Sequence, residues 1–352
     1  MSHLQIAKTL KHVRAFLPGA LSLNLHQAET NIVKTRLDQL FDHAVLGGKN
    51  TRSRLLVDSY SKLKPSASVQ EMDNVSQVAV TIEMLQAFLL IVDDIMDDSK
   101  LRRGKECWYR VPGIGMNAIN DGLLLDCSID LVIRDAIPTH PNLHQIIAAI
   151  YEAKRKTTIG QLLDGQTAGG GNISWARYKQ LVEHKTSHYT FYCPLQMAML
   201  MGDVVGGLRE IKTIAYDLGY LFQAKDDYLD CFVDEGLTGK TSTDIAEGKC
   251  SWIGCSTLDK LKGEPKLKKV FEECYGKNDS KSVDICRTLI GDLKIDNQFH
   301  EFEKMMVKKL SNDIDNFSVN ELKPILHDCL EQIVKPKGVD LAKEKRKIAA
   351  NM

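Results

Sequence analysis

Apolar residues recur along most of the chain with the spacing of a helix, and strand-like alternation is never sustained for several segments. The clearest pattern runs from Val75 to Asp97, which contains no Gly or Pro and is apolar on most faces. A helix buried inside a bundle has this composition, and at 1.5 Å per residue it would be about 35 Å long. The pattern therefore predicts an all-α fold.

Further segments with helical periodicity, separated by short connectors rich in Gly and Pro, are Ile119–Asp135, Leu143–Asp164, Ser174–Met201 and Leu208–Asp230. The stretch Lys260–Ser282 is polar and rich in lysine, which predicts an exposed loop between the last helices. No long polar linker interrupts the chain. We therefore predict a single domain over residues 1–352, with a basic tail at 339–352.

The N-terminal segment allows two interpretations. Residues 1–28 contain no Asp or Glu and carry Lys8, Lys11 and Arg14 among apolar residues. This pattern suits either a first helix that ends near Pro18 or a mitochondrial transit peptide. We expect a soluble cytoplasmic protein, with a mitochondrial location as the alternative. No window approaches eighteen uninterrupted apolar residues, so a transmembrane segment is not expected.

Composition narrows the classes of function. The 352 residues are 43% hydrophobic and 26% charged, which is ample for a large core. Lys plus Arg and Asp plus Glu number 46 each, so no net field would hold nucleic acid or an anionic membrane, and any affinity for phosphate must be local. The nine cysteines are scattered without a C-x-x-C pair, which indicates reduced thiols rather than disulfides or a zinc site.

Two segments with the pattern D-D-x-x-D, Asp93–Asp97 and Asp226–Asp230, each end an apolar helix. The first and last carboxylates of each segment are four residues apart, so they share one helix face and repel each other. A cation must compensate, and a site made only of carboxylate oxygens suits Mg²⁺ completed by substrate phosphates. One such segment would be explained by a solvated helix end, but two indicate a metal clamp on a diphosphate.

Basic residues follow both acidic segments, as a departing diphosphate would require. They are Arg102 and Arg103 after the first and Lys240 and Lys249 after the second. Two further segments are weaker signals of the same kind of site. Gly47–Arg52 places glycines before a basic pair, but a simple turn would also explain it. Lys185–Tyr189 lies beside aromatic residues, but ordinary core aromatics would also explain it.

These strings together resemble the short-chain trans-isoprenyl diphosphate synthases, and most of all the eukaryotic farnesyl diphosphate synthases, over roughly residues 30–335. The matching strings are G-G-K-x-x-R from Gly47, L-Q-A-F from Leu85, D-D-I-M-D and R-R-G from Asp93 to Gly104, G-Q-x-x-D from Gly160, K-T from Lys185, F-Q-x-x-D-D-Y-L-D-C-F from Phe222, and G-K-x-x-T-D-I with K-C-S-W from Gly239. The resemblance implies one large helical bundle around a deep central cavity, both acidic segments at its mouth, and a homodimer.

The resemblance also implies a role for each matching residue. About three Mg²⁺ ions would be held by Asp93, Asp97 and Asp226, with Asp94, Asp227 and Asp230 in supporting or water-mediated roles. An allylic diphosphate would be neutralised by Arg102, Lys185 and Lys240, with Lys249 nearby, and isopentenyl diphosphate would be bound by Lys49, Arg52, Gln86 and Arg103. The carbocation left by ionisation would be stabilised by Thr186 and Gln223, and by cation–π attraction from Tyr189 and Phe191.

The implied product is farnesyl diphosphate. Phe88 and Leu89 precede Asp93 by five and four residues, so they lie about one turn deeper along the cavity wall, where a floor would limit chain length. Animal farnesyl enzymes usually carry aromatics at both positions, so Leu89 should limit the chain length less strictly than an aromatic residue would.

Several departures from the family pattern leave a rival open. They are Ser53, Val233 and Ser242 where Gly is usual, Leu101 where Thr is usual, His188 where an aromatic is usual, and a C-terminus after Val334 that lacks the closing arginine. The rival is a terpene synthase, which would ionise farnesyl or geranyl diphosphate and cyclise or quench the cation. A third hypothesis, a non-catalytic regulatory subunit, conflicts with six retained carboxylates. Against the rival, the residues implied for the second diphosphate are all present.

Overall fold

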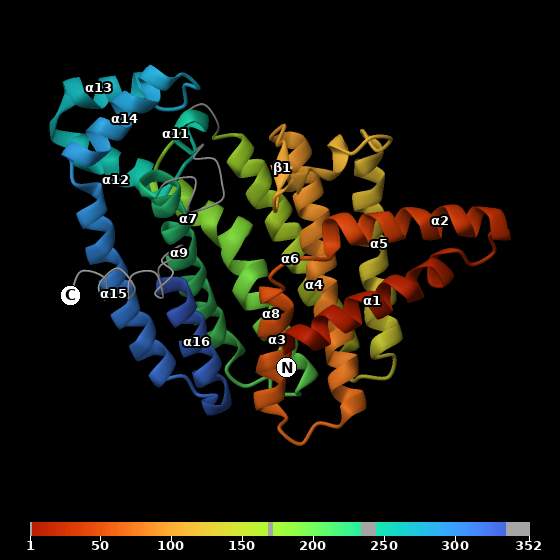
Figure 1. Cartoon of the computed structure of the whole chain (residues 1–352). Coiled ribbons are helices and arrows are strands. Elements are labelled where there is room, and N and C mark those ends of the chain that lie inside the picture. The colour runs from red at the N-terminus through yellow and green to blue at the C-terminus, as the bar shows by residue number, and fades with distance from the viewer. Residues whose placement is uncertain (1, 168–171, 234–243, 336–352) are drawn as a thin grey trace, which may run out of the picture. The chain divides into compact units, whose positions relative to one another are not determined.

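The computed structural model in Figure 1 describes residues 2–167, 172–233 and 244–335. The chain divides into two compact units. Unit 1 comprises residues 1–155, 189–211 and 318–325, and unit 2 comprises residues 156–188, 212–317 and 326–352. Among the described residues, a hairpin of two-residue strands is the regular structure outside the helices, so the all-α prediction is confirmed. The single-domain interpretation stays a prediction.

Most helices belong wholly to one unit. Unit 1 contains α1 (Ser2–Leu21), α2 (Gln27–Leu40), the π-helix η1 (Phe41–Val45), α3 (Thr51–Leu63), α4 (Val69–Met96), β1 (Leu101–Arg102), β2 (Lys105–Glu106), the 3-10 turn η2 (Trp108–Arg110), α5 (Asn117–Ala136), α8 (Cys193–Met201) and η5 (Asn320–Leu322). Unit 2 contains α7 (Trp175–Leu181), α11 (Asp244–Glu247), α12 (Trp252–Lys260), η4 (Leu261–Gly263), α13 (Pro265–Cys274), α14 (Ser280–Asp292) and α15 (Ile295–Asp315). Chain segments shared by both are α6 (Leu143–Gly165), the π-helix η3 (Val182–Tyr192), α9 (Leu208–Phe232) and α16 (Lys323–Val334).

Helix α4 is the centre of unit 1. It begins with a capping box in which the Ser68 hydroxyl and the Glu71 carboxylate bond each other's backbone N–H groups. It packs against α1, α3 and α5. Among the described helices, α4 has the length and hydropathy to cross a membrane, but 67% of its apolar window is buried in the protein. It is therefore the buried core helix that the run from Val75 to Asp97 predicts.

Helix α1 also contributes to the core of unit 1. Ile6, Leu10, Val13 and Leu17 lie along one face and are buried, as the spacing of a core-facing helix requires. This arrangement supports the interpretation of the N-terminus as a first helix. The helix ends at Leu21, three residues after Pro18, near which its end was predicted.

The prediction of an exposed loop over Lys260–Ser282 is wrong. This part of unit 2 contains η4, α13 and the first turn of α14. Phe271 and Tyr275 are buried in the aromatic core of this unit, which also includes Tyr178, Trp252 and Phe299. The lysines occupy the outer face of α13, and their number hid an amphipathic helix with a small apolar face.

Candidate active site

The first acidic segment lies at the C-terminal end of α4, and its members differ in exposure. Asp94 is buried, Asp93 is partly exposed, and Asp97 is exposed. The Arg102 guanidinium donates to Asp94 Oδ1 from Nε at 2.8 Å and from Nη2 at 2.5 Å. Burial would lower the pKa of Arg102, but these hydrogen bonds and the Asp94 charge raise it. Arg102 Nη2 also lies 3.4 Å from Asp93 Oδ2. Arg102 thus holds Asp94 closely and Asp93 more loosely, whereas Asp97 is exposed.

The string R-R-G forms the turn of the β1–β2 hairpin. Leu101 pairs with Glu106 and Arg102 with Lys105, so Arg103 and Gly104 are the two turn residues, with φ of 54° and 75°. Positive φ at both positions is required in the tight turn that matches strand twist, and it is strained for any residue except Gly. The motif therefore fixes Arg103 in a left-handed conformation beside Arg102.

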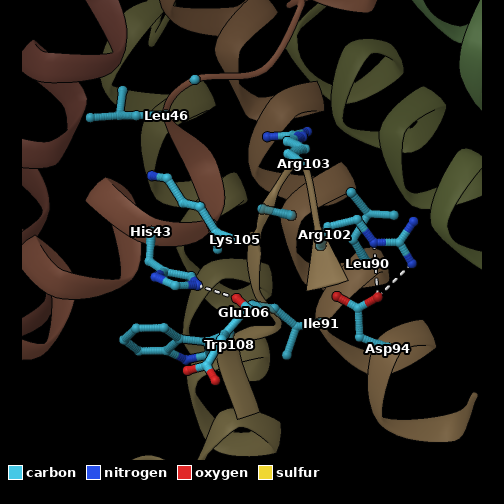
Figure 2. A pocket seen from close by; sticks show the side chains of 13 residues that line it. His43, Leu46, Leu90, Ile91, Asp94, Arg102, Arg103, Lys105, Glu106 and Trp108 are labelled. Atoms are coloured by element: carbon cyan, nitrogen blue, oxygen red, sulfur yellow. Dashed lines mark hydrogen bonds and ion pairs between the residues drawn. The ribbon is translucent and has the colours of Figure 1, made fainter. Parts of the chain in front are cut away.

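An open hollow lies beside this hairpin in unit 1. Figure 2 shows Arg102 paired with Asp94, while Arg103 lies apart from this pair. On the opposite wall His43 Nε2 lies 2.7 Å from the Glu106 carbonyl, and its ring lies 5.1 Å from that of Trp108. These contacts attach the hairpin to η1.

The loop before α3 accommodates the guanidinium of Arg103. Gly47 has a φ of 83°, which favours glycine. A Cβ atom at Gly48 would lie 3.1–3.2 Å from the Arg103 guanidinium, so the missing side chain permits this close approach. Lys49 is exposed next to it. The structure thus brings the Gly-Gly turn and the hairpin together, as the resemblance implies.

Arg52 is held by several groups of unit 1. Its Nη2 donates to the Tyr189 hydroxyl at 2.6 Å and to Thr190 Oγ1 at 2.9 Å. Its Cζ lies 4.1 Å from the centroid of the Tyr189 ring. One face of Tyr189 is therefore occupied by Arg52, which leaves at most the other face for the cation–π role that we predict for this ring. In the amide orientation that satisfies both neighbours, Gln86 accepts from Arg52 Nη1 at 3.1 Å.

A buried carboxylate that the motifs do not indicate, Glu83, lies behind this group. Its Oε1 accepts from the Ser53 N–H at 3.1 Å and the Ser53 hydroxyl at 2.8 Å. Ser53, a departure from the family pattern, is therefore fully buried and hydrogen-bonded. The sequence did offer one sign of this residue. Glu83 is the single Glu within the apolar run of α4, and a buried charge needs specific partners.

The second acidic segment lies near the C-terminal end of α9 in unit 2 and repeats the pattern of the first. Asp226 and Asp230 are partly exposed, whereas Asp227 is buried. Asp227 accepts from the Trp252 backbone N–H at 2.7 Å and from Gln223 Nε2 at 2.9 Å. Burial raises the pKa of the Asp227 carboxyl to about 7, although these hydrogen bonds favour its ionised form.

The residues predicted to stabilise the carbocation lie beside Asp227. The Thr186 hydroxyl donates to Gln223 Oε1 at 2.7 Å, so Thr186, Gln223 and Asp227 form one hydrogen-bonded chain. The neighbouring Lys185 Nζ lies 2.5 Å from Asp164 Oδ2, which comes from the string G-Q-x-x-D of α6. Three strings of the resemblance therefore meet within unit 2.

The π-helix η3 places Lys185 and Thr186 and depends on two glycines. A Cβ atom at Gly160 would lie 2.5 Å from the Lys185 backbone nitrogen, and one at Gly219 would lie 2.2 Å from Ser187 Oγ. Such close approach requires glycine. Wide turns of this kind inside helices occur frequently at functional sites. The sequence predicts a helix from Ser174 to Met201, but not its π-helical middle.

The remaining predicted residues have varied surroundings. Lys249 lies 2.8 Å from Glu247 and 3.7 Å from Asp244. Burial would lower the pKa of Lys249, but these carboxylates raise it. Lys240 lies outside the described residues. His188 is fully buried and contacts the Tyr216 hydroxyl through Nδ1 at 2.8 Å, so this departure is accommodated by core packing.

The predicted chain-length residues lie on α4. Phe88 and Leu89 are both partly buried. The Phe88 ring packs against α5 at Gly122, where a Cβ atom would come within 3.0 Å of the ring. Gly122 therefore gives the ring room to lie close to α5.

The partly exposed aspartates have the right chemistry for Mg²⁺. Within the described residues, no group of three His, Cys, Asp or Glu side chains converges to hold a metal ion unaided. Each acidic segment instead offers carboxylate oxygens one helical turn apart. Mg²⁺ is commonly bound by one or two carboxylates, with waters and substrate phosphates in the other positions. The donor set therefore fits an ion that arrives with a diphosphate. The two segments lie in different units, and their facing each other stays a prediction.

Comparisons with known proteins agree with these observations. The model of the polyprenyl synthetase family matches residues 34–293. Farnesyl pyrophosphate synthase 2 of Arabidopsis thaliana is 36% identical over 307 residues, 85% of this chain and 89% of the plant protein. The mitochondrial farnesyl pyrophosphate synthase 1 of the same plant is 35% identical over 314 residues, 87% and 81% of the two chains. A structure of T. brucei farnesyl diphosphate synthase with homorisedronate has a TM-score of 0.88 at 25% identity and covers 96% of this chain and 100% of its own. The resemblance seen in the motifs is thereby confirmed, and the chain belongs to the polyprenyl synthetase family.

Proposed function

We propose that the protein is a Mg²⁺-dependent prenyltransferase that joins dimethylallyl or geranyl diphosphate to isopentenyl diphosphate and forms farnesyl diphosphate. This proposal rests on one group of side chains in unit 1, Arg52, Gln86 and Arg103, which lie near the Gly-Gly turn. We call it the basic group after its two arginines. A condensing enzyme needs a second diphosphate pocket, whereas a lyase does not. The farnesyl enzymes among the relatives support this proposal.

Each side-chain group has a role in the proposed reaction. Mg²⁺ held by Asp93, Asp97 and Asp226 would neutralise charge on the allylic diphosphate as the C–O bond breaks. Lys185 and Arg102 would stabilise that charge from fixed positions. The oxygens of Thr186 and Gln223 would face the carbocation with partial negative charge.

The second half of the reaction uses the isopentenyl diphosphate. Lys49, Arg52 and Arg103 would hold its diphosphate, so that its double bond is presented to the carbocation. Attack forms the new C–C bond, and loss of a proton, which the released diphosphate is placed to accept, restores a double bond. No water should enter while the cation exists, because water would quench it.

The proposal is tested by product analysis. Purified protein with Mg²⁺ is incubated with geranyl diphosphate and isopentenyl diphosphate, and separately with farnesyl diphosphate alone. We expect extension that depends on isopentenyl diphosphate, and a farnesyl product after dephosphorylation. A volatile terpene from farnesyl diphosphate alone, without extension, would contradict the proposal and identify the terpene synthase. His188, one of the departures that leave this rival open, is buried and contacts the Tyr216 hydroxyl.

Replacing Phe88 with alanine should lengthen the product. The ring fills space between α4 and α5 at Gly122, and its removal leaves a cavity below the acidic segment that could hold another isoprene unit. We expect products longer than farnesyl to become a major fraction, measured by chromatography of the dephosphorylated alcohols. Leu85→Ala, a fully buried control on the same helix, should lower stability by about 2–5 kcal/mol without changing chain length. An unchanged product from Phe88→Ala would exclude Phe88 as the floor.

We also propose a homodimer in the cytoplasm, with the mitochondrion as the alternative compartment. Helix α5 exposes Ile119 and Leu123 at 47% and 49%, and Met116 lies exposed just before it. The three lie on one face, since they are spaced three and four residues apart. An apolar row of this kind supports burial against a second copy of the chain.

A further inference from the structure

Glu83 is a buried carboxylate for which the proposed reaction has no direct use. It is 4% exposed and lies within the long apolar helix α4. Burying a carboxylate is costly unless hydrogen bonds and opposite charges compensate. Its partners therefore show what the fold gains from it.

The first partner is the opening turn of α3. Glu83 Oε1 accepts both the backbone N–H of Ser53, at 3.1 Å, and the Ser53 hydroxyl, at 2.8 Å. This turn includes Arg52, and Lys49 lies just before its N-cap Asn50. Glu83 thus ties to α4 a turn that carries one predicted diphosphate ligand and follows another.

The second partner is Gln86, one turn further along α4. In the amide orientation that satisfies both neighbours, its nitrogen donates to Glu83 Oε2 at 3.1 Å and its oxygen accepts from Arg52 Nη1 at 3.1 Å. Glu83 therefore orients Gln86, and Gln86 orients Arg52. The hydrogen bonds of Arg52 to Tyr189 and Thr190 hold the other end of the guanidinium.

The charge of Glu83 also has a local purpose. Burial lowers the pKa of Arg103, the positive charges of Arg102 and Arg52 lower it further, and the charge of Glu83 acts in the opposite direction. Several guanidinium groups repel one another before an anion binds. A buried carboxylate behind them offsets this repulsion without facing the incoming diphosphate.

We propose that Glu83 is a positioning residue of the isopentenyl diphosphate pocket, which holds Arg52 and Gln86 in a binding arrangement through its contacts with Ser53 and Gln86. This inference rests on the proposed function and adds a residue to it. It also assigns a use to Ser53. The hydroxyl that replaces the usual glycine hydrogen supplies a second hydrogen bond to Glu83 and fixes its orientation.

The test compares two substitutions of Glu83. Glu83→Ala removes both acceptor oxygens, so we expect KM for isopentenyl diphosphate to rise about tenfold or more, since hydrogen bonds that involve charged groups are lost. KM for geranyl diphosphate should stay within about twofold, because Ser53 and Gln86, the hydrogen-bond partners of Glu83 in the described part of the chain, are not predicted to bind the allylic diphosphate. Glu83→Gln keeps an acceptor for both Ser53 donors but loses the charge and the acceptor for Gln86, so it should restore only part of the affinity for isopentenyl diphosphate.

Asp121→Asn is the matched control. Asp121 is as buried as Glu83 and lies in the same unit, where it accepts from Trp108 Nε1 at 2.8 Å and faces Arg36 at 3.4 Å. It has no contact with the basic group. We expect a lower Tm for this variant and no change in the ratio of the two KM values.

Direct binding of isopentenyl diphosphate, measured by calorimetry on the intact protein, separates this inference from the proposed function. If the wild-type protein does not bind isopentenyl diphosphate, the proposed function fails. If it binds and Glu83→Ala binds equally well, the positioning role is overturned and the proposed function stands. Equal rises in both KM values, or a Gln variant as impaired as the Ala variant, would also overturn it.

Discussion

Replacing Asp226 with alanine is expected to lower turnover by about a thousandfold or more without lowering Tm. The carboxylate is partly exposed at the end of α9, and it lies on one face with Asp230, which it repels. Its use is therefore expected to be in binding Mg²⁺ with the diphosphate. A metal ion contributes several kcal/mol to charge stabilisation in the transition state, and such a loss corresponds to this change in rate.

The neighbouring Asp227 serves as the contrast. Asp227→Ala should lower both turnover and Tm, because the Trp252 N–H and the Gln223 amide would lose their acceptor in a buried position. Each donor left unsatisfied costs about 1–3 kcal/mol. Thr186 would also lose its indirect attachment through Gln223.

Calorimetric melting with and without Mg²⁺ and inorganic diphosphate distinguishes the two variants. The wild-type Tm should rise when both are added, because ligands that bind the folded state stabilise it. Asp226→Ala should start from the wild-type Tm and lose most of this rise. Near wild-type turnover in Asp226→Ala would refute the metal assignment, and a large fall in its Tm without ligand would mean that Asp226 is structural.

Helix geometry explains why adjacent aspartates differ in this way. Residues i and i+4 share a face, whereas residue i+1 is turned by about 100°. In both acidic segments the first and last carboxylates are more exposed than the second, which is buried and bonded to Arg102 in one case and to the Trp252 N–H in the other. From the sequence we predicted that the first and last carboxylates share a face. That the second one is buried was not predicted, and Asp230 was grouped with Asp94 and Asp227.

Features set by short-range pattern were predictable, and features set by packing between distant segments were not. The buried helix from Val75 to Asp97 was predicted because its apolar run has a single explanation. The helix within Lys260–Ser282 was missed because its apolar face is narrow and its lysines dominate the composition. The role of Glu83 was missed because its partner Ser53 is 30 residues away, and no local pattern encodes that contact.

The π-helical form of η3 was also not predicted, because contacts with segments distant in sequence determine it. Its wide turns place Lys185 and Ser187 against glycines of α6 and α9, so its geometry is decided by three helices that are separate in sequence. Residues Val182–Tyr192 are mostly weak helix formers, but helix propensity does not distinguish a π-helix from an α-helix. Single glycines within helical patterns at Gly160 and Gly219 were the available signal, since glycine is unfavourable there unless close packing requires it.

Gly160→Ala should therefore destabilise the protein by about 1–3 kcal/mol, as overpacking does, and lower turnover by about a hundredfold, because a displacement near 1 Å has this effect on catalysis. The added Cβ would lie 2.5 Å from the Lys185 nitrogen and 2.9 Å from the His184 carbonyl carbon. Both are backbone atoms, so no side-chain rotation can relieve the clash.

Gly165→Ala, at the end of the same helix, is the control, since its Cβ would meet no atom within 4 Å. It should keep wild-type turnover and a Tm no lower than that of the wild type. Denaturant unfolding and steady-state kinetics on both variants measure the two effects. If Gly160→Ala behaved like Gly165→Ala, the close contact between α6 and η3 would not be needed to place Lys185, and the π-helix would have another cause.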